Sequence, residues 1–188
     1  YGSYFGGISV RKLSADGLTS DPASQTPIAI ANRYEGAFVL KRGGFYYLFA
    51  SATDCCRGPL TGYSVFVGRS ASPLGPFVDA EGVSLLAGRV GGTTVLSMNG
   101  NRWVGPGHNA IVTDLAGQDW IVYHAVDRND PYFAGAVGFT KRPVLLDPVD
   151  WVQGWPVVRG GRWASSTPQV GPVTGPGDIK RTQQYPLW

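Results

Sequence analysis

The sequence predicts an all-β protein assembled from repeated antiparallel strand units. Glycine (27 residues) and proline (14 residues) are spread among short apolar runs, and aromatic residues make up 12% of the 188 residues. This composition is typical of many strands joined by tight turns. No window places apolar residues at helix spacing over three turns. The charged fraction of 15% argues against a disordered chain and against long surface helices.

The first half of the chain contains several short runs with strand character, separated by turn formers. A hairpin is expected around Gly43 and Gly44, because glycine pairs favour the tight turns that join antiparallel strands. We expect all of these strands to form one antiparallel sheet. The predicted strands are residues 7–13, 28–31, 35–40, 45–51 and 63–70.

The second half repeats the pattern and then becomes rich in proline and glycine. Residues 93–96 lead to a second hairpin over 108–125, followed by a strand over 139–146. Residues 147–151 contain Asp-Pro and are expected to turn the chain into a last strand at 154–158. We therefore predict a folded part over residues 1–165 and a tail or linker over 166–188.

The two hairpins align with each other, which indicates an internal repeat. His108 lies 73 residues after Glu35, whereas Trp120 lies 74 residues after Tyr46. One inserted turn residue explains the change. In a radial repeat the first strand of each unit lines a central channel, so Glu35 and His108 are expected to occupy matching, channel-facing positions. The chain holds about three such units, whereas closed propellers typically have about 4 to 8 blades.

Charge and cysteine content exclude several classes of function. The net charge is +3, but the basic residues are spread along the chain, so we expect no nucleic-acid partner. No apolar run approaches the ~20 residues that cross a bilayer. The two cysteines are adjacent, Cys55 and Cys56, and a disulfide between neighbours is strained. We expect two buried thiols at the end of a strand, with a thiol lining a ligand pocket as the alternative.

Several separated motifs, in the right order over about residues 1–160, resemble glycoside hydrolase family 43. Within it, the likeness is greatest to the arabinanases and the α-L-arabinofuranosidases. The motifs are Tyr1–Ile8, Glu35–Phe38, Cys55–Gly58, Val67–Ser70, Gly75–Asp79, Gly105–Asn109 and Asp150–Pro156.

The resemblance implies a five-bladed β-propeller that cleaves glycosidic bonds with inversion, this chain supplying roughly the last three blades. It assigns Glu35 as the general acid. An inverting glycosidase also needs a carboxylate that activates water, about 6.5 to 9.5 Å from the acid. The resemblance places this base, and an aspartate that tunes the acid, in a preceding N-terminal segment. That segment is expected in cis or as a separate chain.

Further site residues are expected around this acid. The resemblance implies that His108 contacts a cation, with calcium in a structural or channel-bound role, or else hydrogen bonds to substrate or a neighbouring acid. Cys55 corresponds to a pocket-lining residue of the relatives. Phe5, beside Tyr4, can offer a flat face to a sugar ring, and Ser3 a hydroxyl; Arg142 can bind a sugar hydroxyl or pair with an acid. His124 is interpreted as structural.

The resemblance therefore predicts a secreted hydrolase of α-1,5-L-arabinan or arabino-oligosaccharides from plant cell walls. Secretion is expected because cells cannot import a whole polysaccharide. Two alternatives stay open: a β-xylosidase or galactan-directed enzyme of the same family, and a non-catalytic sugar-binding propeller. As an isolated chain, these residues are expected to be inactive, because the base is supplied from outside.

Overall fold

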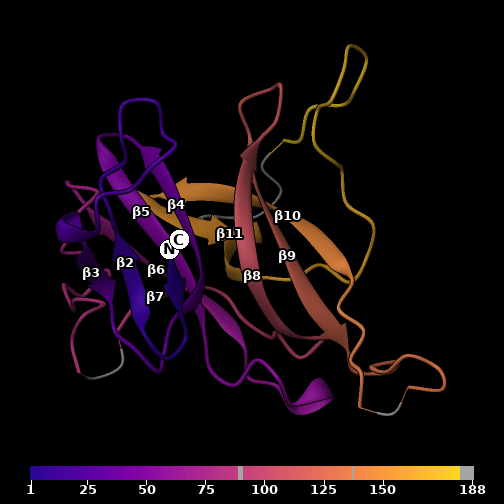
Figure 1. The fold of residues 1–188 in the computed structure, drawn as a ribbon. Helices are drawn as coiled ribbons and strands as arrows, with labels where there is room; N and C mark the ends of the chain where they lie inside the picture. Colours follow the sequence, from indigo (N-terminus) through magenta and orange to yellow (C-terminus); the bar gives the residue numbers. More distant parts are fainter. Residues whose placement is uncertain (89–90, 137, 183–188) are drawn as a thin grey trace. The chain divides into compact units, whose positions relative to one another are not determined.

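The computed structural model describes residues 1–88, 91–136 and 138–182 (Figure 1). The described residues contain no α-helix, which confirms the all-β prediction. Their only helical elements are three 3-10 turns, η1 (Pro22–Ser24), η2 (Gly58–Leu60) and η3 (Arg159–Gly161). No helix in the described part of the chain is long and apolar enough to span a membrane.

Most of the secondary structure is β-strand, and both predicted hairpins are present. The strands in chain order are β1 (Gly2–Ser3), β2 (Gly7–Val10), β3 (Thr26–Ala29), β4 (Glu35–Arg42), β5 (Phe45–Ala52), β6 (Ser64–Ser70), β7 (Thr93–Leu96), β8 (Trp103–Thr113), β9 (Asp119–Asp127), β10 (Val144–Val152) and β11 (Trp155–Val158).

The strands form three sheets, not the two groups that the sequence suggested. Their orders are β1-β2-β3, β4-β5-β6-β7 and β11-β10-β9-β8. The expectation of a single sheet over the first half is therefore wrong. Between β3 and β4 the chain passes through Asn32, whose left-handed backbone (φ 58°) interrupts the extended conformation. After it, β4 pairs with β5 and starts a new sheet.

The position of the tenth strand also differs from the prediction. The strand expected over residues 139–146 is observed as β10, and Asp147–Trp151, expected as a turn, lies inside it. Asp147 is fully buried there and accepts a hydrogen bond from the hydroxyl of Tyr123 (2.6 Å). This tertiary contact overrides the local turn preference of Asp-Pro. The actual turn is Gln153–Gly154, where both residues have positive φ.

The chain divides into two compact units. The first unit comprises residues 1–51 and 66–93, and the second comprises 52–65 and 94–188. In the second unit, β8 and β9 form a long hairpin that β10 and β11 continue (Figure 1). Each unit has its own buried apolar side chains, such as Ile8, Phe49 and Phe77 in the first, and Trp120, Ile121 and Val158 in the second.

The predicted tail contacts the second unit where it is described. The backbone N–H of Val173 donates to Asp114 Oδ2 (3.0 Å), and its carbonyl accepts from the N–H of Leu115 (3.0 Å). Arg181 forms an ion pair with Asp150. These contacts hold residues 173–181 against the β8–β9 turn and the sheet. The remainder of the predicted tail, residues 183–188, lies outside the described residues.

Candidate active site

Glu35 is the first residue of β4 and is half-buried. The residue before it, Tyr34, is fully buried, and its hydroxyl donates to the carbonyl oxygen of Gly91 (2.6 Å). Arg33 Nη2 donates to the same carbonyl (3.1 Å), and its guanidinium lies over the Tyr34 ring (4.8 Å). Two side chains thus fix the backbone immediately before the carboxylate.

A β-bulge follows Glu35. Glu35 pairs with Ser51 of β5, whereas the next regular pair is Phe38 with Phe49, so two residues of β4 oppose one of β5. Gly36 adopts the left-handed conformation (φ 57°) that this bulge requires. The bulge therefore re-aims the end of β4 that carries the carboxylate.

The turn with Ser3 and Phe5 reaches the same end of β4. The backbone N–H of Asn32 donates to the carbonyl of Tyr4 (2.7 Å), which ties this turn to the segment entering β4. Phe5 is 80% exposed and packs edge-to-face on Tyr4 (ring centroids 5.3 Å apart). The Ser3 hydroxyl accepts from the N–H of Gly6 (3.1 Å) and retains its own hydrogen for donation. The first unit thus gathers three of the five predicted site residues.

His108 lies in a second bulge, in β8 of the second unit. Its side chain is exposed and its φ is 51°, a conformation that costs a non-glycine residue about 1–2 kcal/mol. Gly107 pairs with His124 and Ala110 pairs with Val122, so His108 and Asn109 are the two bulged residues. A strained backbone at an exposed histidine is typical of functional sites.

The two bulges correct the predicted alignment by one residue. Ala110 lies 72 residues after Phe38, and Val122 lies 73 residues after Phe49, in equivalent pairs of the two ladders. His108 therefore matches Gly36, with which it shares the left-handed backbone. The prediction that His108 matches Glu35 is wrong. The predicted difference of one residue between the offsets of the first and second strands is correct. The offsets themselves were each too large by one, because the types of the side chains alone do not fix the register.

His108 belongs to a ring cluster that the sequence did not suggest. Its ring lies 6.4 Å from that of His124, which stacks on Tyr63 (centroids 5.9 Å apart, planes 10° apart). His124 Nδ1 is buried without a hydrogen-bond partner among the described residues. Burial, followed by the positive charges of Arg142 and His108, lowers the pKa of His124 to about 4. His124 is therefore neutral at ordinary pH.

Asn109, next to His108, is a further residue that sequence reasoning missed. It is 5% exposed, and neither side-chain Nδ2 nor Oδ1 has a partner among the described residues. Together with His108 and His124 it lines a cavity of about 290 Å³ in the second unit. Buried amides without partners are rare, so this amide calls for a ligand, water or further chain. Its place beside His108 in the motif was the available signal.

The described residues do not build a calcium cage at His108. No group of three or more His, Cys, Asp or Glu side chains in the described ranges could hold a metal ion. Calcium takes about 6 to 8 oxygen ligands. His108, the Oδ1 of Asn109 and the Nδ1 of His124 are the candidate ligands among the described residues that line this cavity, so any cation there needs water or further chain for most of its coordination.

The state of the two cysteines differs from the prediction. Cys55 and Cys56 form a disulfide, with Cys55 half-buried and Cys56 exposed, so the expectation of two buried thiols is wrong. Two left-handed residues, Thr53 and Asp54, turn the chain away from the end of β5 and out of the core. Arg142 Nη2 donates to the carbonyl of Cys55 (2.7 Å). The guanidinium thus binds a backbone carbonyl and not the acid considered above.

Comparisons with known proteins place these features in a family. The family model of glycosyl hydrolases family 43 matches residues 2–156. The chain is 36% identical, over 147 residues, to the extracellular exo-α-(1→5)-L-arabinofuranosidase of Cellvibrio japonicus, covering 70% of this chain and 41% of the relative. It is 31% identical to the extracellular endo-α-(1→5)-L-arabinanase 1 of Bacillus subtilis, covering 83% of this chain and 45% of that protein.

Solved structures give the same likeness. The α-L-arabinanase of Cellvibrio cellulosa matches with a TM-score of 0.71 and 31% identity, covering 84% of this chain and 51% of that one. The same enzyme in complex with arabinohexaose matches with a TM-score of 0.70 and 30% identity, at the same coverage. The chain thus spans about half the length of the relatives it matches.

Proposed function

Because the chain belongs to glycosyl hydrolase family 43, we propose that the protein of which it forms part hydrolyses α-1,5-linked arabinan or arabino-oligosaccharides. The observation that carries this proposal is Glu35, held at the end of β4 by the buried Tyr34 and re-aimed by the bulge at Gly36. Relatives named as arabinanases and as an arabinofuranosidase support the substrate class.

In this proposal Glu35 is the general acid that protonates the leaving oxygen. Inversion needs a second carboxylate, which activates water on the opposite face of the sugar. We assign that base, and the aspartate that tunes Glu35, to a preceding segment of the propeller. Ser3 and Phe5 are proposed to contact the sugar, because the turn that carries them is tied to the entry of β4.

We further propose that the fold is part of a five-bladed β-propeller. The sheets β4-β5-β6-β7 and β8-β9-β10-β11 each join four consecutive strands in sequence order, which is the topology of a blade. The sheet β1-β2-β3 has only three strands and corresponds to the outer strands of a preceding blade. An additional strand beside β1 would complete it.

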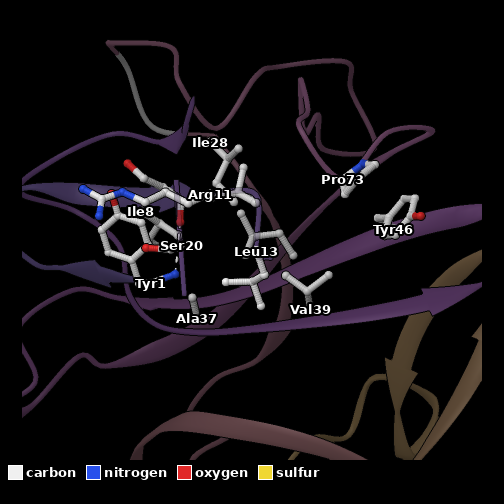
Figure 2. A pocket seen from close by; sticks show the side chains of 13 residues that line it. Tyr1, Ile8, Arg11, Leu13, Ser20, Ile28, Ala37, Val39, Tyr46 and Pro73 are labelled. Atoms are coloured by element: carbon white, nitrogen blue, oxygen red, sulfur yellow. Dashed lines mark hydrogen bonds between the residues drawn. The ribbon is translucent and has the colours of Figure 1, made fainter. Parts of the chain in front are cut away.

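The first unit has an apolar cleft that a preceding segment of the propeller could cover (Figure 2). The cleft measures about 600 Å³, and Ile8, Leu13 and Val39 are among its lining residues. Leu13 is 57% exposed and Val39 is 47% exposed. Covering apolar side chains that are exposed to water in this way is favourable, because it removes apolar surface from water. We propose that the preceding part of the propeller, in cis or as a separate chain, covers this cleft.

Two less direct proposals accompany this function. We propose that calcium binds at His108 with water and further chain as its other ligands, so metal analysis of the longer protein should find calcium that is lost in His108→Ala. Secretion is proposed because the Cellvibrio japonicus and Bacillus subtilis relatives are named as extracellular. Fractionation of the source culture would test it, since the activity should appear in the medium.

The deciding experiment compares substrates on the longer protein that contains this chain. Arabinohexaose should be cleaved, and NMR during the first turnovers should detect the inverted anomer. Xylo- and galacto-oligosaccharides, which test the other specificities of the family, should be cleaved far more slowly. Binding of arabinohexaose without cleavage would instead support a non-catalytic sugar-binding propeller.

A second comparison tests the missing segment. Residues 1–188 expressed alone should neither hydrolyse arabinan nor melt cooperatively as a monomer. Adding the preceding segment should restore both properties together, because the same blades supply the base and cover the open cleft. A cooperatively melting, active monomer of the isolated chain would show that both the blade count and the placement of the base are wrong.

A further inference from the structure

The bond between Cys55 and Cys56 joins two neighbours in an exposed loop. The Cα atoms are 3.8 Å apart, which is the spacing of adjacent residues and is shorter than the range of ordinary disulfides. The bond closes only the small ring around one peptide bond. It therefore links no distant parts of the chain and removes little entropy from the unfolded state.

The surroundings of this bond favour attack by a thiol. Cys56 is exposed, so a reagent in solution can reach its sulfur. The guanidinium of Arg142 is hydrogen bonded to the backbone carbonyl of Cys55 (2.7 Å), the residue whose sulfur would leave as a thiolate. A nearby cation lowers the pKa of a thiol and makes its thiolate a better leaving group. The neighbouring Arg57 is paired with Asp54 (2.7 Å), so Arg142 is the main cation.

The loop around the bond is held by contacts that do not involve sulfur. Thr53 Oγ1 donates to the carbonyl oxygens of Ala52 and Gly62, and Thr61 Oγ1 donates to the carbonyl of Asp54 (2.6 Å). These bonds brace the base of the loop on both sides of the cysteine pair. Opening the disulfide would therefore change the Cys55–Cys56 peptide and its contact with Arg142 without unfolding the second unit.

We propose that the Cys55–Cys56 disulfide is a site of reversible thiol modification, and that its redox state sets the position of Arg142. A low-molecular-weight thiol attacks Sγ of Cys56, the S–S bond breaks, and Cys55 leaves as a thiolate. A second thiol then releases the mixed disulfide. The products are two cysteine thiols and one oxidised disulfide of the reagent. The chain has no other cysteine with which the reduced pair could exchange.

The first test measures the modification itself on the longer folded protein. The protein is equilibrated with graded mixtures of reduced and oxidised glutathione, quenched with acid and alkylated, and the peptide with both cysteines is analysed by mass spectrometry. At millimolar reduced glutathione this peptide should carry two alkyl groups, or one alkyl group and one glutathione. Alkylation without any reductant, or none until the protein is denatured, would overturn the proposal.

The second test uses Arg142→Gln to examine the role of the cation. Loss of the guanidinium should slow thiol exchange, because the leaving thiolate loses a nearby positive charge that favours it. Arg57→Gln serves as the matched control, because that guanidinium is already paired with Asp54, and its rate should stay closer to the parent. Equal rates in the Arg142→Gln variant and the parent would remove Arg142 from the proposal.

The third test concerns activity and rests on the proposed function. Turnover of arabinohexaose should differ between the oxidised and the reduced protein, with the change in KM larger than that in kcat, because Arg142 is not a catalytic residue. The double variant Cys55→Ser, Cys56→Ser should not respond to glutathione. If neither form is active, the proposed function fails, while the mass measurement still decides the modification. A glutathione response in the double variant would contradict the assignment to this bond.

Discussion

The hairpins β4–β5 and β8–β9 share a backbone plan but carry different chemistry. Each has a bulge near the start of its first strand, with a left-handed residue that is Gly36 in one and His108 in the other. Glycine adopts this conformation without strain, whereas the same conformation costs a histidine about 1–2 kcal/mol. The first hairpin thus offers an unstrained acid at its end, and the second stores strain at an exposed imidazole.

The turns of the two hairpins also differ, both in length and in the residues that close them. Gly43 and Gly44, both with positive φ, close the first hairpin in a two-residue turn. The second hairpin closes over residues 114–118, where Asp114 Oδ1 accepts from the N–H groups of Ala116 and Gln118 (both 2.9 Å). Gly117 has a positive φ (80°) in this turn as well, so the longer turn adds a side-chain acceptor to the conformational freedom of glycine. The two hairpins therefore show that the same strand arrangement can be built with different turns and bulge residues. Residue identity alone cannot set the register between the two repeats.

The largest expected effect is on the stability of the second hairpin. Its Tyr123 donates to the buried carboxylate of Asp147, whose Oδ1 also lies 3.7 Å from Arg159 Nε, while the equivalent residue of the first hairpin is Ala50. Asp147→Ala should destabilise the protein by about 3–5 kcal/mol, because it removes the buried carboxylate that faces the Arg159 guanidinium and accepts from Tyr123. Urea unfolding measures this. Tyr123→Phe should cost only about 1.5–3 kcal/mol, and a smaller loss for Asp147→Ala than for Tyr123→Phe would contradict this network.

The next effect is on catalysis at the first hairpin. Glu35→Gln in the longer protein should lower hydrolysis of arabino-oligosaccharides by at least about a hundredfold, the usual loss for a general acid. A substrate with a dinitrophenolate leaving group should be affected much less, because that group departs without protonation. Glu81→Gln, which changes the other glutamate of the sequence, is the control. Equal losses on both substrates would exclude Glu35 as the acid.

The third prediction changes the left-handed residue in each of the two bulges. Gly36→Ala should cost about 1–2 kcal/mol, since alanine is strained at φ 57°, whereas His108→Gly should release a similar strain. Thermal melting of both variants measures the difference. His108→Gly should also lower the turnover if the imidazole serves the site. A stabilised variant with unchanged activity would show that the strain at His108 has no function in catalysis.

His108→Ala separates chemistry from strain at the same position. Alanine retains the strained φ but removes the imidazole, so the melting temperature should change by only a few degrees while catalysis is impaired. Turnover per folded molecule and a thermal melt together decide the matter. A large loss of folded protein with normal turnover per folded molecule would indicate a structural histidine instead.

The last expected effect is a pH dependence from His124. Its pKa falls from the ordinary 6.5 to about 4 in the folded protein, chiefly through burial. Between these values the unfolded chain binds a proton that the folded chain does not, so stability is lost as the pH falls from about 6.5 to about 4. Melting temperatures across this range should fall less steeply in His124→Gln than in the parent. An identical slope in the two proteins would contradict the buried neutral imidazole.

Much of the strand content could be predicted from the sequence, because it depends on local patterns. Alternating apolar residues and glycine turns located both hairpins, and the absence of helical spacing excluded α-helices from the described residues. β10 was misplaced because Asp147 and Pro148 favour a turn locally. Only the contact with Tyr123, which is distant in sequence, reveals that Asp147 belongs inside a strand.

The candidate site divides in the same way. The family motifs pointed to Glu35 and His108 as candidate site residues, and the comparisons confirm the family. The stacking of His124 on Tyr63, the unpartnered amide of Asn109 and the hydrogen bond from Arg142 to Cys55 join segments far apart in the chain. No pattern in the sequence encodes such pairs, because they depend on how sheets pack.

The sequence by itself determined the β class, the hairpin turn at Gly43 and Gly44, and the family, since these follow from residue spacing and from motifs read along the chain. Only the tertiary structure decided the register of the bulges, the state of the Cys55–Cys56 pair and the burial of Asp147. The physical reason is that side chains in a strand alternate between two faces, so a shift of one residue reverses what faces the core. Local preference cannot distinguish those two registers, whereas long-range packing and hydrogen bonding can.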